Sequence, residues 1–513
     1  MSCARVHDPK TLTKGQRLSK RACTLSLALA AVVLGGCASD PSLLPHEKMP
    51  TSQELAAKLA LQPPEPEVAS LPSTTWWTAY NDPELTRWVE AGLADSPTLR
   101  EATARWQQAQ AFLALTRAAQ LPSVAASADS TAQRISGNGI FPPPLAGMVG
   151  TINDVDLSAA LELDLFGRLS ARTDAARWNA QASTIDRELA RIRLAGAIGH
   201  AYFELARAQR ARRIAVEIET ARKQTLELVR RRVSAGFDTQ VERRLAEVTV
   251  PEIRVDIERA DEEIALSRHA IAVLAGKGPE AANAVDARLP EEGALVAPAA
   301  LPLDLLARRA DVAAAQRRVF AALSSVEAAR ADFYPNINLM ALVGLNSFTT
   351  QLLFEYGSRT WQVGPAIHLP IFDGGALRAH LRSASAETDA AIDAYNETIL
   401  QAAREVADAA SSIAAVKRQR EQQALATEHA QAAFELASIR YEAGLGNYLT
   451  VLTAQGGVLV QRRAQVELDA RAAALDVSLA LALGGGFRDE KPSPEPHAQA
   501  RPDEYPLTSA AEH

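Results

Sequence analysis

The stretch VDLSAALELDLFG, residues 155–167, alternates apolar and polar side chains with unusual regularity. Successive side chains of an extended chain point to opposite faces. One face therefore receives Val155, Leu157, Ala159, Leu161, Leu163 and Leu165. The opposite face receives Asp156, Ser158, Ala160, Glu162 and Asp164. The stretch predicts a strand with one wholly apolar face and one face that carries acids.

A second stretch, VGPAIHLPIFDGG at residues 363–375, repeats this pattern and has His368 on its polar face. The chain runs through the same order of elements twice, over residues 76–278 and 304–486, with a connector at 279–303. We expect two strands in each repeat. Their expected bounds are about 123–136 and 151–166 in the first repeat and about 336–347 and 360–372 in the second.

The sequence permits a helix of about 65 residues after each pair of strands, because no proline interrupts either region. Apolar or small residues recur there at alternating spacings of three and four, which is typical of a coiled-coil seam. The seam residues are Leu189, Ile192, Gly196, Gly199, Phe203 and Ala206, and then Ile392, Tyr395, Ile399, Ala402, Val406, Ala409, Ile413 and Val416. Turns at Gly236 and Gly444 are expected to end the two helices.

The N-terminus has the pattern of a secretory signal. Basic residues precede a short apolar run, Ala22 to Leu34, and the sequence LGGC, which ends at Cys37, resembles the lipobox of bacterial lipoproteins. We expect residues 1–36 to be a signal peptide and 37–75 an extended segment whose lipid is attached to Cys37, the one cysteine left after cleavage. An ordinary cleaved signal, with Cys37 incidental, is the alternative. Residues 487–513 are expected to be a disordered tail.

Composition and motifs exclude several functions. The net charge of -7 argues against nucleic acid as a partner. No catalytic motif and no metal-ligand spacing stands out among the scattered histidines, so we expect no enzyme activity, no metal and no cofactor beyond the covalent lipid.

Four strands cannot close a transmembrane barrel, which needs at least eight, so closure would require several copies of the chain. The apolar face would then contact lipid. Asp156, Glu162, Asp164 and His368 would face a watery lumen. A soluble β-sandwich flanked by helices is the alternative, since alternation alone does not distinguish lipid from a protein core.

Three motifs resemble those of the TolC-like outer-membrane efflux family, in its lipoprotein branch of OprM and NodT type. They are WWTAYNDPEL at residues 76–85, RRADV at 308–312, where the family usually has proline in place of Ala310, and RYEAG at 440–444, which VLTAQ follows. The resemblance covers nearly all of residues 76–486.

The resemblance implies a mainly α fold with a transmembrane β-barrel. A homotrimer would form a 12-stranded β-barrel continued by a 12-helix periplasmic α-barrel. The implied partners are a periplasmic adaptor protein, an inner-membrane RND-type transporter and the lipid of the outer membrane. A gate would lie at the periplasmic tip, near Gly236, Asp238, Arg440, Tyr441 and Gly444. There Asp238 would form an acidic constriction in three copies, or would simply cap a helix.

The sequence thus predicts the outer-membrane exit duct of a tripartite efflux pump, held in the outer membrane of a Gram-negative bacterium. Two alternatives stay open. One is the duct of a type I protein secretion system, and the other is a non-conducting coiled-coil lipoprotein of the envelope.

Overall fold

The computed structural model describes residues 43–50, 54, 72–290 and 308–489. The expected signal peptide, the lipidation site Cys37 and nearly all of the expected tail lie outside the described residues. In the part of the chain that the structure describes, no helix is both long enough and apolar enough to cross a membrane.

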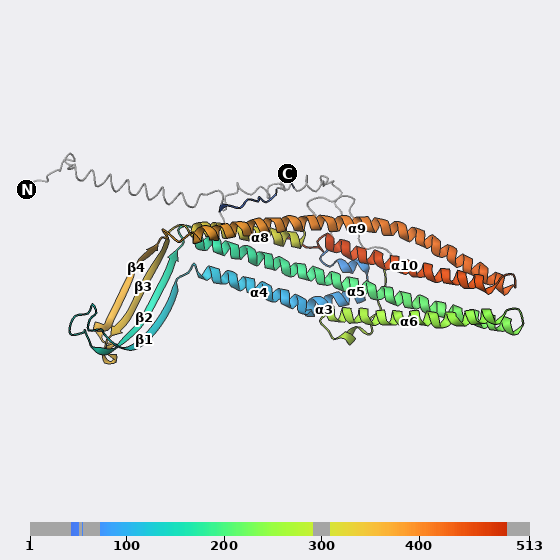
Figure 1. Cartoon of the computed structure of the whole chain (residues 1–513), viewed down its shortest axis with the longest axis horizontal. Helices are drawn as coiled ribbons and strands as arrows, with labels where there is room; N and C mark the ends of the chain where they lie inside the picture. Colours follow the sequence, from blue (N-terminus) through green and yellow to red (C-terminus); the bar gives the residue numbers. More distant parts are fainter. Residues whose placement is uncertain (1–42, 51–53, 55–71, 291–307, 490–513) are drawn as a thin grey trace, which may run out of the picture. The chain divides into compact units, whose positions relative to one another are not determined.

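The elements follow the tandem order expected from the sequence (Figure 1). The first repeat and the start of the connector contain η2 (Trp76–Tyr80), α3 (Pro83–Asp95), α4 (Pro97–Ala118), β1 (Ser123–Arg134), β2 (Val149–Leu163), α5 (Arg168–Ser234), α6 (Gln240–Leu274) and η3 (Pro279–Ala282). The second contains α8 (Ala310–Ala331), β3 (Asn336–Ser347), η4 (Thr350–Leu352), η5 (Tyr356–Ser358), β4 (Arg359–His368), α9 (Ala376–Glu442) and α10 (Tyr448–Ala482).

The chain divides into two compact units. One unit contains the sheet with the helix ends that adjoin it, within residues 43–48, 109–180 and 317–393. The other contains most of the long helices and their tip turns, within residues 72–108, 181–290, 308–316 and 394–489. The long helices α5 and α9 each contribute residues to both units.

The four strands form one antiparallel sheet in the order β1, β2, β3, β4. The register places Leu157 of β2 opposite Ala126 of β1 and Val343 of β3, and Val343 lies opposite Trp361 of β4. Because directly opposed residues share a face, the register makes the apolar face continuous across all four strands. It consists of alternate residues from Val124 to Ala128, from Val155 to Leu163, from Ile337 to Leu345 and from Trp361 to Ile367.

This apolar face is exposed in the single chain. Trp361 is 78% exposed and Ile367 67%. Strands β1 and β4 have one neighbour each, so both edges of the sheet also lack a partner within the described chain. Exposing an apolar face and two unpaired sheet edges to water is energetically costly. We therefore expect another surface to cover them.

Several strand ends differ from the expected bounds. Strand β2 ends at Leu163 and β4 at His368, before the residues expected to close them. An aspartate in each following turn accepts amide hydrogen bonds from the next helix. Asp164 accepts from Leu169 N at 3.0 Å, and Asp373 accepts from Leu377 N at 2.7 Å. These bonds stabilise the helix starts and end the strands.

The two tryptophans of the entry motif lie in the largest apolar cluster of their unit, where Trp76 and Trp77 are each 2% exposed. Asp82 caps α3 by accepting from Glu84 N at 2.9 Å and from Leu85 N at 3.2 Å, and it also accepts from the Tyr202 hydroxyl at 2.6 Å. The motif therefore attaches the start of the first repeat to α5.

The glycines of the first seam permit close approach between helices. A Cβ at Gly196 would lie 2.5 Å from Leu481 Cδ1 of α10. Apart from the half-buried Leu189 and Ile413, the residues of both predicted seams are buried, which confirms the seam assignment.

Candidate functional site

The polar face of the sheet carries acids and, within the four strands, neither lysine nor arginine. It consists of the strand residues that alternate with those of the apolar face, and it includes Asp129, Asp154, Asp156, Glu162 and His368. A wall of this kind is hydrated and has a negative potential.

Asp156 lies directly across the sheet from Gly344. A Cβ at Gly344 would come within 1.9 Å of Asp156 Oδ1, so glycine leaves room for the carboxylate over β3. Asp154, which the sequence analysis did not select, accepts a hydrogen bond from Asn346 Nδ2 at 2.5 Å. Asp129 is directly opposite Asp154. Both acids could have been found by continuing the alternation back from Val155 and by pairing β1 with β2.

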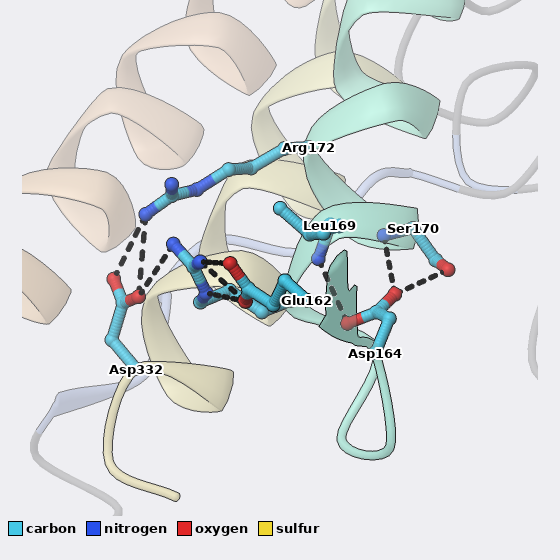
Figure 2. Close-up of polar contacts among 7 residues, drawn as sticks. Glu162, Asp164, Leu169, Ser170, Arg172 and Asp332 are labelled. Carbon is cyan, nitrogen blue, oxygen red and sulfur yellow. Dashed lines mark hydrogen bonds and ion pairs between the residues drawn. The ribbon is translucent and has the colours of Figure 1, made fainter. Parts of the chain in front are cut away.

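Glu162 lies on the polar face but its charge is paired (Figure 2). Arg168, the first residue of α5, donates to Glu162 Oε2 at 2.6 Å. Arg172 Nη2 lies 3.2 Å from Asp332 Oδ1, beyond the end of α8. These ion pairs connect the end of β2 with the ends of two helices in the same unit.

The prediction that Asp164 belongs to the strand is wrong. It lies beyond Leu163 in the turn that precedes α5, where it accepts from Ser170 N at 2.7 Å and from Ser170 Oγ at 2.6 Å (Figure 2). In the sequence, the alternation of apolar and polar residues continues past the end of the strand. It therefore does not distinguish an aspartate that caps the next helix from an aspartate that belongs to the strand.

At the turns that end the long helices, two of the predicted gate residues are joined by a hydrogen bond. The Tyr441 hydroxyl donates a hydrogen bond to Asp238 Oδ2. Arg232 Nε donates to the same oxygen at 2.9 Å, and Arg232 Nη1 donates to the Tyr441 carbonyl at 3.0 Å. The guanidinium carbon lies 4.4 Å from the centre of the Tyr441 ring. We call these three residues the tip link.

The tip link lies in a protected setting. Tyr441 is 1% exposed and packs on Tyr448, with ring centres 6.0 Å apart, in an apolar cluster that includes Val229 and Val451. Burial, and then the bond to Asp238, raise the pKa of the Tyr441 phenol above its usual range. The bond to Asp238 also raises the pKa of Arg232. The phenol therefore stays a donor, and the guanidinium stays charged, at neutral pH.

The sequence analysis missed Arg232 and selected Arg440. Each arginine precedes its turn glycine by four residues, Arg232 before Gly236 and Arg440 before Gly444. The side chain of Arg440 is exposed, and its carbonyl accepts from Leu445 N at 2.8 Å. Aligning the two repeats on their glycines would have identified Arg232.

The two turns have the same backbone geometry. Gly236 has φ 80° and Gly444 has φ 74°, and in each turn the next amide bonds back to the arginine carbonyl. A residue with a side chain is strained at such angles, so glycine is required.

The alternative that Asp238 caps a helix is wrong. Thr239 is the cap of α6, and it forms a capping box with Glu242. Asp238 instead pairs with Arg232, and its side chain is 10% exposed.

In the described ranges, no group of three or more His, Cys, Asp or Glu side chains is placed to hold a metal ion. The polar contacts at the sheet and at the tip are structural in kind, with carboxylates bound to arginines, amides and hydroxyls. The arrangement can orient helices and shape a potential.

Comparisons with known proteins agree with this arrangement. The sequence model of the outer membrane efflux protein family matches residues 88–277 and 301–485. The fusaric acid resistance protein FusA of Burkholderia cepacia is 36% identical over 371 residues, which are 71% of this chain and 69% of FusA. The outer membrane protein OprJ of Pseudomonas aeruginosa is 31% identical over 480 residues, 92% of this chain and 97% of OprJ.

The crystal structure of the outer membrane protein VceC from Vibrio cholerae superposes with a TM-score of 0.76 at 32% identity. The match covers 81% of this chain and all of VceC. The fold is therefore shared with a solved relative, and this chain belongs to the outer membrane efflux protein family and is an outer-membrane efflux channel.

Proposed function

We propose that three copies of this chain form the outer-membrane exit duct of a tripartite pump that exports small molecules. The observation that carries the proposal is the open four-stranded sheet, which has one continuous apolar face, one acidic face and two unpaired edges. Edge pairing between copies would close twelve strands into a barrel, with the apolar face toward lipid and the acids toward water.

Passage through this duct involves no chemical step. The pump supplies the energy, and the chain supplies a hydrated path and a gate. The acids of the polar face favour cations in the path, because three copies multiply their negative potential within a narrow space.

The tip link supports a gate that is closed at rest. It attaches the turn after α5 to the end of α9 through a partly buried, charge-assisted hydrogen bond. A periplasmic adaptor would open the gate by replacing these bonds with contacts of its own. The expected inner-membrane partner is an RND-type transporter, and FusA, a resistance protein, supports small molecules as the exported class.

Cys37 would carry the lipid that holds the mature N-terminus on the outer membrane. Incorporation of labelled fatty acid tests this part separately, since a Cys37→Ala chain should take up none. Continued uptake by that variant would refute the assignment.

Conductance and subunit count test the duct itself. Purified protein should behave as a trimer in detergent and conduct in planar bilayers with cation preference. An elongated monomer without conductance would favour the envelope scaffold. The protein secretion alternative predicts a neighbouring gene for an ATP-driven exporter instead of a resistance-type transporter.

A further inference from the structure

A short segment near the N-terminus is docked on two helices of the sheet-containing unit. Leu43 is 1% exposed, and it packs among Val326 and Ala329 of α8 and Leu381 and Ala384 of α9. Burying a leucine side chain in this way stabilises the contact.

Two hydrogen bonds give the segment a direction. Ser385 Oγ donates to the Leu43 carbonyl at 2.6 Å, and Glu47 N donates to Asp389 Oδ1 at 2.9 Å. Asp389 lies one turn further from β4 along α9 than Ser385 does. The chain therefore leads away from the strands as it runs from Leu43 to Glu47, and Leu43 is at the end of the segment nearer the strands.

The docking point lies close to the strands within the unit. Val326 and Ala329 are in the last two turns of α8, which ends five residues before β3 begins. Ala384 is eight residues into α9, which corresponds to about 12 Å of helix.

We propose that residues 43–47 form an N-terminal latch that fixes the attachment point of the lipid anchor beside the strand ends and so orients the sheet toward the membrane for assembly. The proposal rests on the proposed lipidation of Cys37. Cys37 precedes Leu43 by six residues, a length that spans at most about 20 Å. The latch makes this short stretch the whole tether.

Tether length determines how often the sheet meets the membrane in the right orientation. Without the latch, the next buried residue of the described chain is Pro72, which is 35 residues from Cys37. The effective concentration of a tethered group falls roughly as the 3/2 power of tether length, so releasing the latch would dilute the sheet at the membrane about 14-fold. We expect trimer formation to slow by a comparable factor.

The test compares Leu43→Asp, which places a charge in the cluster, with the conservative Leu43→Met. Lys48→Asp places the same aspartate side chain at an exposed position of the same segment and changes the charge by two units instead of one. Each is made in the full chain with Cys37 and with Cys37→Ala. Trimer formation is followed by native gels after pulse-labelling, and labelled fatty acid reports lipidation.

The latch predicts that Leu43→Asp slows trimer formation about tenfold in the lipidated chain and has no added effect in the Cys37→Ala chain. Leu43→Met and Lys48→Asp should assemble like the native chain. Equal slowing in both backgrounds would show that Leu43 only stabilises the fold, and this would overturn the proposal, as would no slowing at all. If the native chain takes up no fatty acid, the lipidation itself is refuted, and the latch has no anchor to position.

A second variant keeps Leu43 in place, in case Leu43→Asp does not fold. Twelve Gly and Ser residues inserted after Asp40 lengthen the tether from six to eighteen residues, which dilutes the sheet about fivefold by the same scaling. Trimer formation should slow about fivefold while lipidation stays normal. An unchanged rate would overturn the proposal.

Discussion

Tyr441 and Asp238 are 203 residues apart in the sequence, and the Tyr441 hydroxyl donates a hydrogen bond to the Asp238 carboxylate. The bond joins the last turn of α9 to the turn between α5 and α6, one from each repeat. Arg232 holds both partners, through Asp238 Oδ2 and through the Tyr441 carbonyl. The tip of the chain is therefore fastened by three side chains, and each of them can be removed singly.

Removing the tip link should open the channel. In Asp238→Ala and Arg232→Ala, a partly buried charged group loses its partner, and a hydrogen bond to a charged group contributes about 1.5–3 kcal/mol. We expect the open fraction of trimers in planar bilayers to rise about tenfold or more in each variant. Arg440→Ala is the matched control from the other repeat, and it should conduct like the native channel because its side chain is exposed. A large effect of Arg440→Ala with none of Arg232→Ala would contradict the link.

The tip link should also respond to alkaline pH with a defined sign. A free tyrosine ionises near pH 10, and burial raises the pKa of Tyr441 in the folded chain. The raised pKa gives stability that is fully present below pH 10 and is lost as pH rises through the folded value. Conductance of the native channel should therefore stay constant from pH 7 to about pH 10 and increase above it. Tyr441→Phe should conduct more at every pH and lack the alkaline increase, and a native increase below pH 9 would speak against this origin.

Local sequence signals predicted most of the fold. Alternation from Val155 to Leu163 predicted the two faces of β2, and the absence of proline predicted α5 and α9. Gly236 and Gly444 were predictable because only glycine tolerates the angles at which these helices end. These features depend on residues that are neighbours along the chain.

Long-range partners were harder to predict. Arg232 contacts Tyr441 only because the two tip turns meet in the folded chain. The sequence alone does not indicate which of its many arginines lies at that meeting point. Asp164 continued the alternation of β2, although its carboxylate caps α5. The docking of Leu43 on α8 and α9 depends on the packing of three separate segments. Such contacts follow from tertiary geometry, which periodicity and spacing do not encode.

The acids of the polar face should set the ion preference of the channel. Replacing Asp154 and Asp156 together by asparagine removes two carboxylates from each chain without changing side-chain size. We expect the cation preference, measured as the reversal potential in a salt gradient, to fall markedly, and to fall less at high salt because screening already weakens the field. Ser158 lies on the same face and is uncharged, so Ser158→Ala should leave the reversal potential unchanged. Anion selectivity of the native channel would contradict the assignment of this face to the lumen.

Gly344 and Gly364 offer a test of the sheet geometry with a built-in control. Both lie on the polar face, in β3 and β4. A Cβ at Gly344 would lie 1.9 Å from Asp156 Oδ1 and 2.7 Å from the Val155 carbonyl, whereas a Cβ at Gly364 would meet nothing within 4 Å. Gly344→Ala must displace Asp156 and strain β2, at a cost of about 1–3 kcal/mol per chain. The melting temperature of the purified trimer should therefore drop for Gly344→Ala and stay close to native for Gly364→Ala.

If Gly344→Ala is tolerated as well as Gly364→Ala, the register that places Asp156 across from Gly344 does not hold in the assembled channel. If Asp156→Ala restores the stability of Gly344→Ala, the clash lies at this carboxylate, because removing it leaves room for the new methyl group.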